Sequence, residues 1–169
     1  MMDENFKQKL NRVKLLMFDV DGVFTDGSLI LLENGDQVRS FNIKDGFAVQ
    51  LAIKAGVKIA VITGARSAAV KSRLNYLGIE DVYLGVHDKI EKYEDYKHSY
   101  GYTDDEILYM GDDLPDYDIM KRVGVPVCPG DAVHEIQNLS IYVSHHAGGK
   151  GCVRDVIEQY MRLKGLWVK

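Results

Sequence analysis

The sequence predicts an α/β protein in which one doubly wound parallel sheet is covered by helices on both faces. Short apolar runs alternate along the chain with segments whose apolar residues recur at helical spacing, and this alternation is typical of βαβ units with right-handed crossovers. The length of 169 residues suits one domain with its own core. Several apolar runs end in acidic or hydroxyl residues, at the edge where such sheets bind ligands.

The first strand is predicted at residues 13–18, a compact apolar run bounded by polar residues. Its composition is typical of a strand that is buried on both faces of a sheet. A β-hairpin is predicted at about residues 28–43, because two strand-like segments flank the pair Asn34-Gly35, a strong signal for a tight turn. The hairpin arm at residues 29–32 is continuously apolar, so we expect another surface to cover it.

The remaining elements follow from apolar periodicity and from the glycines that end helices. The helix that begins at Asp45 ends at Gly56, and the helix through Val70 and Leu74 ends at Gly78. No repeat or low-complexity segment interrupts the pattern, so residues 1–169 are expected to form a single domain. Further helices are expected at 88–100, 114–123, 133–138 and 152–164, and further strands at 57–62, 82–84, 107–110, 125–128 and 141–143.

Composition argues against several classes of function. The net charge is −4 and the 21 Lys and Arg residues are scattered, so we expect no nucleic-acid partner and favour a small-molecule partner. Residues 1–14 are polar and of mixed charge, which indicates neither a signal peptide nor a membrane anchor and favours a cytoplasmic location. Cys128 and Cys152 lack CxxC spacing, so we expect two buried thiols rather than a zinc site or a disulfide framework.

Polar residues follow four of the predicted strands. Because the carboxyl ends of parallel strands meet at one edge of a sheet, these side chains should converge there. The set combines carboxylates with one hydroxyl and one ammonium group. Its members are Asp19 and Asp21 after the first strand, Thr63 after the second, Lys89 at the start of the helix after the third, and Asp112, Asp113 and Asp116 after the fourth.

This combination indicates phosphate chemistry with a divalent cation. Mg²⁺ prefers oxygen ligands and is usually held by one or two carboxylates together with substrate phosphate oxygens, so Asp19 and Asp112 are its natural ligands. A carboxylate can also attack phosphorus and form an aspartyl phosphate, once the metal and Lys89 offset the repulsion between two anions. Asp19 is therefore the expected nucleophile, and Asp21 the expected general acid and base.

Each of these residues also has a simpler structural interpretation. Thr63 could cap a helix, Lys89 could be solvated on a helix face, and Asp112 could complement a helix dipole. The order of the residues favours catalysis, because four consecutive strand-to-helix junctions each supply a needed group. A phosphoacceptor receiver domain uses similar residues, but it places the phosphorylated Asp after strand three, where this chain has Leu84-Gly85.

These motifs resemble those of the haloacid dehalogenase superfamily. The likeness rests on Asp19-Val20-Asp21-Gly22, on Thr63 and Lys89, and on Gly111-Asp112-Asp113-Leu114-Pro115-Asp116, and it spans most of the chain. The resemblance implies a Rossmann-like core and a Mg²⁺ ion bound by Asp19, the main-chain carbonyl of Asp21 and Asp112. It also implies that Asp113 and Asp116 support the metal-bound waters and Lys89.

A closer likeness is to the capless branch of this superfamily, carried by FDVDGVFTDG, FNIKDGFAVQLAIKAG, GDDLPD and AGGKGCVRD. Only the hairpin and one helix separate the first motif from Thr63, so no cap domain is expected. The branch implies a phosphatase that acts on the sugar acid 3-deoxy-D-manno-octulosonate 8-phosphate in lipopolysaccharide biosynthesis. It also implies a homotetramer whose hairpins form a barrel and whose neighbouring subunits complete each active site. The alternatives are a hairpin arm folded back on its own domain and a catalytically idle, phosphatase-like module.

The same branch implies the substrate contacts. An arginine on the helix after the Thr motif faces the sugar-acid carboxylate in these enzymes, and Arg73 occupies that place. The residue after Gly64 is usually Arg in octulosonate phosphatases and Glu in nine-carbon deaminoneuraminate phosphatases, whereas here it is Ala65, followed by Arg66. Lys150 in GGKG resembles the octulosonate pattern. The implied substrate-binding residues are Gly64, Arg66, Arg73 and Lys150, and the nine-carbon acid is the alternative substrate.

Overall fold

The computed structural model describes residues 5–167 and contains one six-stranded sheet. The strand order is β5-β4-β1-β6-β7-β8, and every neighbouring pair is parallel. The predicted doubly wound sheet is therefore confirmed. Its strands are β1 (Leu15–Phe18), β4 (Lys58–Ile62), β5 (Asp81–Tyr83), β6 (Ile107–Met110), β7 (Val125–Cys128) and β8 (Tyr142–Val143).

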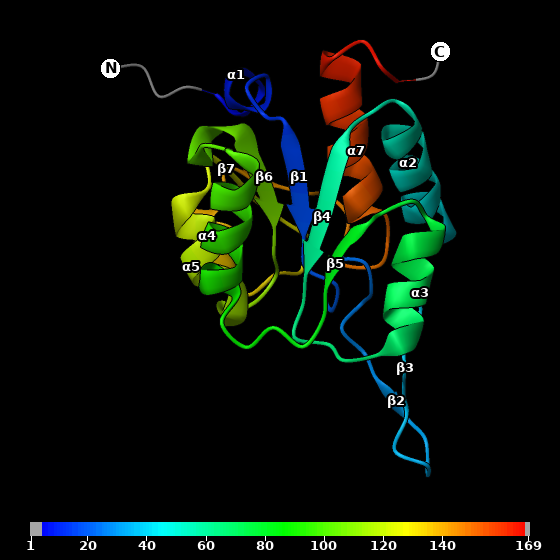
Figure 1. Cartoon of the computed structure of the whole chain (residues 1–169). Helices are drawn as coiled ribbons and strands as arrows, with labels where there is room; N and C mark the ends of the chain where they lie inside the picture. Colours follow the sequence, from blue (N-terminus) through cyan, green and yellow to red (C-terminus); the bar gives the residue numbers. More distant parts are fainter. Residues whose placement is uncertain (1–4, 168–169) are drawn as a thin grey trace.

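Helices cover both faces of this sheet, as Figure 1 shows. Leu16 and Phe18 belong to the core on one face, whereas Leu15 and Met17 belong to the core on the other. Successive strand residues point to opposite faces, so the uninterrupted apolar run supplies both cores. The first face carries α2 (Ile43–Lys54), α3 (Ala68–Tyr76) and α7 (Cys152–Leu163), and the second carries α4 (Lys89–Tyr100), α5 (Tyr117–Arg122) and α6 (His134–Leu139).

The central strand β1 brings the candidate site residues to one edge. Phe18, its last residue, lies opposite Val61 of β4 and Met110 of β6. The backbone N–H of Asp19 extends the pairing by donating to Met110 O at 3.0 Å. The residues that follow these three adjacent strands therefore emerge together, as the strand-end argument predicts.

Three local features depart from the predicted elements. A short N-terminal helix, α1 (Phe6–Leu10), was not predicted, although Asn5 and Gln8 form a capping box that signals it. Thr103 and Glu106 also form a capping box on a 3-10 turn that leads directly into β6. The helix predicted at 114–123 is divided, because Leu114–Asp116 is a 3-10 turn containing proline and α5 begins only at Tyr117.

The hairpin projects away from the domain in Figure 1. Its two strands, β2 (Ile30–Leu31) and β3 (Gln37–Val38), pair antiparallel and are shorter than the sequence indicates. Ile30 is 63% exposed and Leu31 is 71% exposed. In the single chain the apolar arm therefore does not fold back on its own domain, which is the alternative left open by the sequence, and its side chains are exposed.

Cys128 and Cys152 are free and buried, as expected. Within residues 5–167, none of the helices is both long enough and apolar enough to cross a membrane.

Candidate active site

Asp19 is delivered to the site by β1 and is almost fully buried. Its Oδ1 accepts a hydrogen bond from the N–H of Val20 at 2.6 Å, and its Oδ2 lies 2.7 Å from Lys89 Nζ. Burial raises the pKa of Asp19 to about 7 and the charge of Asp116 adds to the rise, although Lys89 opposes it. An ionised Asp19 therefore needs more positive charge than Lys89 alone supplies.

Lys89 bridges two carboxylates at the start of α4. Its Nζ lies 2.7 Å from Asp19 Oδ2 and 2.7 Å from Asp116 Oδ1, and its side chain is only 5% exposed. Burial by itself lowers the pKa of Lys89, but Asp19 and Asp116 outweigh that effect and raise it above its ordinary value. Lys89 is therefore a fixed cation in the site.

Asp116 has both of its carboxylate oxygens engaged by protein groups. Oδ1 accepts from Lys89 Nζ at 2.7 Å and from the hydroxyl of Tyr109 at 2.6 Å, and Oδ2 accepts from the N–H of Asp112 at 3.1 Å. These bonds fix Lys89 and the backbone of Asp112. The geometry suits a supporting role better than direct metal ligation.

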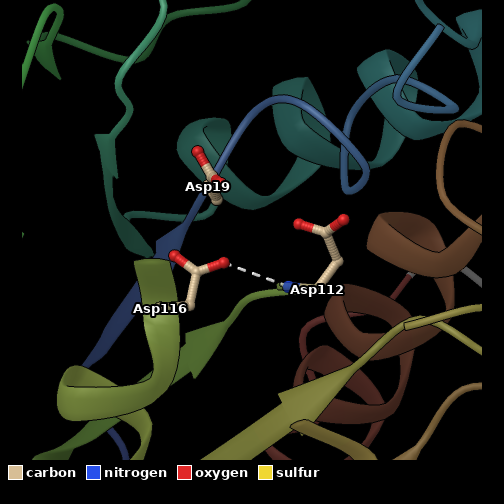
Figure 2. A group of neighbouring side chains, drawn as sticks. All are labelled: Asp19, Asp112 and Asp116. Carbon is tan, nitrogen blue, oxygen red and sulfur yellow. Dashed lines mark hydrogen bonds between the residues drawn. The ribbon is translucent and has the colours of Figure 1, made fainter. Parts of the chain in front are cut away.

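Figure 2 shows the side chains of Asp19, Asp112 and Asp116 around a common space beyond the ends of β1 and β6. One carboxylate oxygen from each residue lies within 4.8 Å of the others. Burial, followed by the charges of Asp116 and Asp19, raises the pKa of Asp112 to about 8. Among the described residues, Lys89 is the one ammonium paired with these carboxylates, and the excess of negative charge fits an oxygen-seeking divalent cation such as Mg²⁺.

Glycines allow the surrounding loops to approach this cluster. Gly22 has φ +81°, and a Cβ built there lies 1.8 Å from Asp112 Oδ2, so a side chain at this position would displace the carboxylate. A Cβ on Gly148 lies 2.0 Å from Gly22 O, and the N–H of Gly149 donates to Val23 O at 2.9 Å. The glycine-rich segment 148–151 is therefore packed directly on the loop that follows Asp19.

Asp21 carries an ion pair that the sequence did not indicate. Arg39, at the base of the hairpin, donates from Nε to Asp21 Oδ1 at 2.7 Å and from Nη2 to Asp21 Oδ2 at 3.1 Å. The Arg39 side chain is only 5% exposed, whereas that of Asp21 is 37% exposed. The expected general acid and base is thus joined to the hairpin by a two-point contact.

Two further residues of the predicted site, Thr63 and Asp113, make local backbone contacts, as does Asp26, which is not among the predicted site residues. Thr63 is buried at the end of β4, and its hydroxyl accepts from the N–H of Ala65 at 3.2 Å. Asp113 is exposed and caps the 3-10 turn by accepting from the N–H of Leu114 at 2.7 Å. Asp26 accepts from the N–H of Ser28 at 3.0 Å, which shapes the departure of the hairpin.

A cavity of about 1100 Å³ extends from Asp21 between the hairpin and the start of α3. Gly64, Arg66 and Arg73 are among its lining residues, so three of the four implied substrate contacts meet in one groove. Lys150 is placed differently, because its Nζ lies 3.8 Å from Asp26 Oδ2 and its side chain is 65% exposed.

Comparison with known proteins gives the family. Residues 81–156 match the haloacid dehalogenase-like hydrolase family. The 3-deoxy-D-manno-octulosonate 8-phosphate phosphatase KdsC of Salmonella typhi is 34% identical over 157 residues, which cover 93% of this chain and 84% of that protein. This chain belongs to the haloacid dehalogenase superfamily. The expected superfamily and the expected hydrolase class are both confirmed.

Two solved structures of phosphatases are similar to this chain over most of its length. The 3-deoxy-D-manno-octulosonate 8-phosphate phosphatase of Yersinia pestis aligns with a TM-score of 0.92 at 32% identity and covers 95% of this chain and 87% of its own. The corresponding phosphatase of Moraxella catarrhalis, solved with magnesium, phosphate and KDO (the sugar acid without its phosphate), aligns with a TM-score of 0.90 at 31% identity. That alignment covers 96% of this chain and 93% of the other.

Proposed function

We propose that this protein is a Mg²⁺-dependent phosphatase that converts 3-deoxy-D-manno-octulosonate 8-phosphate to KDO and phosphate in lipopolysaccharide biosynthesis. The observation that carries the proposal is the buried contact of Lys89 with both Asp19 and Asp116 at 2.7 Å, beside Asp112. This arrangement binds a phosphate next to a nucleophilic carboxylate. The phosphatases from Salmonella typhi and Moraxella catarrhalis support the choice of substrate.

In the first half of the proposed reaction, a carboxylate oxygen of Asp19 attacks phosphorus and the ester P–O bond breaks. Lys89 offsets the charge of the incoming phosphate, and Asp21 gives a proton to the departing alkoxide oxygen. Asp19, Asp112 and the main-chain carbonyl of Asp21 are the groups that would hold Mg²⁺, which supplies further positive charge for the phosphoryl oxygens when it is bound. The products of this half are the free sugar acid and an aspartyl phosphate.

In the second half, Asp21 takes a proton from a water molecule whose oxygen attacks the phosphorus. The bond between phosphorus and Asp19 then breaks, which regenerates the carboxylate and releases inorganic phosphate. Thr63 and Gly64 lie beside the phosphate at the end of β4 in this proposal, and Asp113 would support the water ligands of a bound Mg²⁺. Asp116 keeps Lys89 and the backbone of Asp112 in place throughout both halves.

The test compares kcat/KM for 3-deoxy-D-manno-octulosonate 8-phosphate, a nine-carbon sugar-acid 9-phosphate and glucose 6-phosphate, with Mg²⁺ and with EDTA. We expect the eight-carbon acid to be preferred and EDTA to abolish phosphate release. Asp19→Asn, which removes the nucleophile, should abolish release as well and so exclude a contaminating phosphatase. Equal activity on glucose 6-phosphate would refute a sugar-acid substrate, and preference for the nine-carbon acid would favour the alternative.

We also propose that the protein acts in the cytoplasm as a homotetramer in which the exposed hairpin arm packs against neighbouring subunits and helps to close each active site. The support is the exposure of Ile30 and Leu31 on an element that also carries Arg39, the partner of Asp21. An exposed apolar segment of this kind marks an association surface.

Sedimentation velocity tests this assembly with the variant Leu31→Asp. Because Leu31 is 71% exposed in the single chain, the substitution should leave the fold intact and shift the protein to smaller species. Leu166→Asp, which makes the same change at a residue that is 42% exposed beyond α7, is the matched control. A monomeric wild-type protein, or an unchanged tetramer in Leu31→Asp, would contradict the proposed role of the hairpin.

A further inference from the structure

Two arginines of the groove, Arg66 and Arg73, face partners other than carboxylates. The groove is lined by Arg39, Arg66 and Arg73 together with Asp21 and Asp36, and Arg39 is already paired with Asp21. Within residues 5–167, neither Arg66 nor Arg73 has a carboxylate within ion-pair distance. Arg66 contacts the imidazole of His87, and the guanidinium of Arg73 lies over the ring of Tyr76. The groove therefore holds guanidinium groups that are available for an anionic group on the substrate other than its phosphate.

Arg66 is fixed in position although it is exposed. Its Nη2 lies 2.6 Å from Nε2 of His87. A guanidinium has donors and no acceptor, so Arg66 donates to an unprotonated Nε2 and the imidazole carries its proton on Nδ1. The aliphatic stem of Arg66 runs over Gly85, where an added Cβ would lie 3.3 Å from Cγ. The stem and the head are thus both held by the loop between β5 and α4.

That loop is itself attached to the loop that carries Arg66. The N–H of Gly85 donates to Ala65 O at 2.9 Å, and the N–H of Val86 donates to Thr63 O at 3.0 Å. His87 and Arg66 therefore keep a constant separation. A long side chain that is ordered before the substrate arrives loses less entropy on binding, and this preorganisation increases affinity.

We propose that His87 is a positioning residue that holds Arg66 as the anchor for the substrate carboxylate, and that this pair makes the enzyme prefer acidic substrates. The inference rests on the proposed phosphatase function. With Nη2 held by His87, the other N–H donors of Arg66 remain for the carboxylate, and a guanidinium fork matches carboxylate geometry. Octulosonate phosphatases usually have an arginine directly after the residue that corresponds to Gly64, where this chain has Ala65. In this arrangement Arg66, one position later in the sequence, provides the guanidinium instead.

The test uses the Mg²⁺-loaded enzyme with three kinetic readouts. These are KM and kcat for 3-deoxy-D-manno-octulosonate 8-phosphate, and the inhibition constants of KDO and of inorganic phosphate against 4-nitrophenyl phosphate hydrolysis. In His87→Ala we expect KM for the sugar-acid phosphate and the inhibition constant of KDO to rise about tenfold, the effect of losing one hydrogen bond to a charged group. The kcat value and the inhibition constant of phosphate should change little, because the phosphate site is not touched.

Two further variants distinguish positioning from general damage. His87→Gln places an acceptor oxygen near the former Nε2 and should restore most of the lost affinity for KDO. In an Arg66→Met background, His87→Ala should have no further effect, because the residue it positions is gone. His98→Ala, at an exposed histidine near the end of α4, is the matched control and should behave as wild type.

The inference is overturned if His87→Ala leaves both KM for 3-deoxy-D-manno-octulosonate 8-phosphate and the inhibition constant of KDO unchanged. It is also overturned if His87→Ala weakens the binding of KDO and of inorganic phosphate equally, or if its effect persists in the Arg66→Met background. Failure of the proposed function gives a different result, in which the wild-type enzyme hydrolyses 4-nitrophenyl phosphate but not the octulosonate substrate. The pair 6-phosphogluconate and glucose 6-phosphate then decides the inference. A preference for the acid that His87→Ala removes would support it, and the absence of such a preference would refute it.

Discussion

The excess of negative charge at Asp19, Asp112 and Asp116 predicts that the metal-free protein loses stability as the pH rises. Burial and mutual repulsion raise the pKa of Asp19 to about 7 and that of Asp112 to about 8, whereas the pKa of an Asp in an unfolded chain is about 3.9. Between about pH 5 and pH 7, the folded state therefore keeps protons on these carboxyls that the unfolded state has lost. Under that condition the free energy of unfolding falls with increasing pH.

The expected magnitude follows from the number of protons involved. Each proton retained only by the folded state lowers the free energy of unfolding by about 1.4 kcal/mol per pH unit. Full retention of both protons would therefore lower the free energy of unfolding by at most about 5.6 kcal/mol over two pH units. Asp104 and Glu106 have the opposite effect on the free energy of unfolding, because their pKa values are lowered in the folded state. These two carboxyls are ionised in both the folded and the unfolded state above the ordinary pKa range of carboxyl groups, so they add little to the pH dependence of the free energy of unfolding between about pH 5 and pH 7.

Urea denaturation at intervals from about pH 5 to pH 8, with EDTA or with saturating Mg²⁺, measures this effect. In EDTA the free energy of unfolding should fall with pH, and the stabilisation by Mg²⁺ should grow over the same range because the ion binds the deprotonated carboxylates. Asp112→Asn removes one of the two site carboxyls whose pKa is raised and should reduce the dependence of the free energy of unfolding on pH. A free energy in EDTA that is constant or rises with pH, or an unchanged slope in Asp112→Asn, would refute the reasoning.

Substitutions at three other positions separate the roles within the site. Asp21→Asn should lower kcat/KM by about 10²- to 10⁴-fold. It should leave the Mg²⁺-induced shift in melting temperature unchanged, because only the main-chain carbonyl of Asp21 is a proposed metal ligand. Normal turnover would contradict the role of Asp21 as general acid and base. Asp116→Ala leaves the hydroxyl of Tyr109 without its buried acceptor, while Lys89 keeps its contact with Asp19, and should destabilise the fold by about 1–3 kcal/mol, whereas the exposed Asp113→Ala should not. Gly148→Ala places a Cβ 2.0 Å from Gly22 O and should weaken Mg²⁺ binding measured by calorimetry; unchanged affinity would show that the loops adjust.

Features that depend on neighbouring residues could be predicted from the sequence. The apolar run before Asp19 predicted a doubly buried strand, and the order of the strand-end residues predicted that Asp19, Lys89 and Asp112 converge. Gly22 is part of the motif that the sequence shows, and the closeness of Asp112 in the structure explains why this residue is glycine. The helix α1 was not predicted, although Asn5 and Gln8 of its capping box are present in the sequence, because five residues are too few to show a helical period of apolar residues.

Contacts between distant segments were decided only by the tertiary structure. Arg39 and Asp21 are 18 positions apart, and Arg66 and His87 are 21 apart, so no local period relates them. Periodicity and strand order predict the face or edge on which a residue lies, but each charged side chain there has several possible partners. The selection among them depends on how the loops are held, here by glycines and by backbone hydrogen bonds between loops. By itself, the sequence determined a sheet edge rich in carboxylates, and the packing of its loops decided which carboxylate meets which cation.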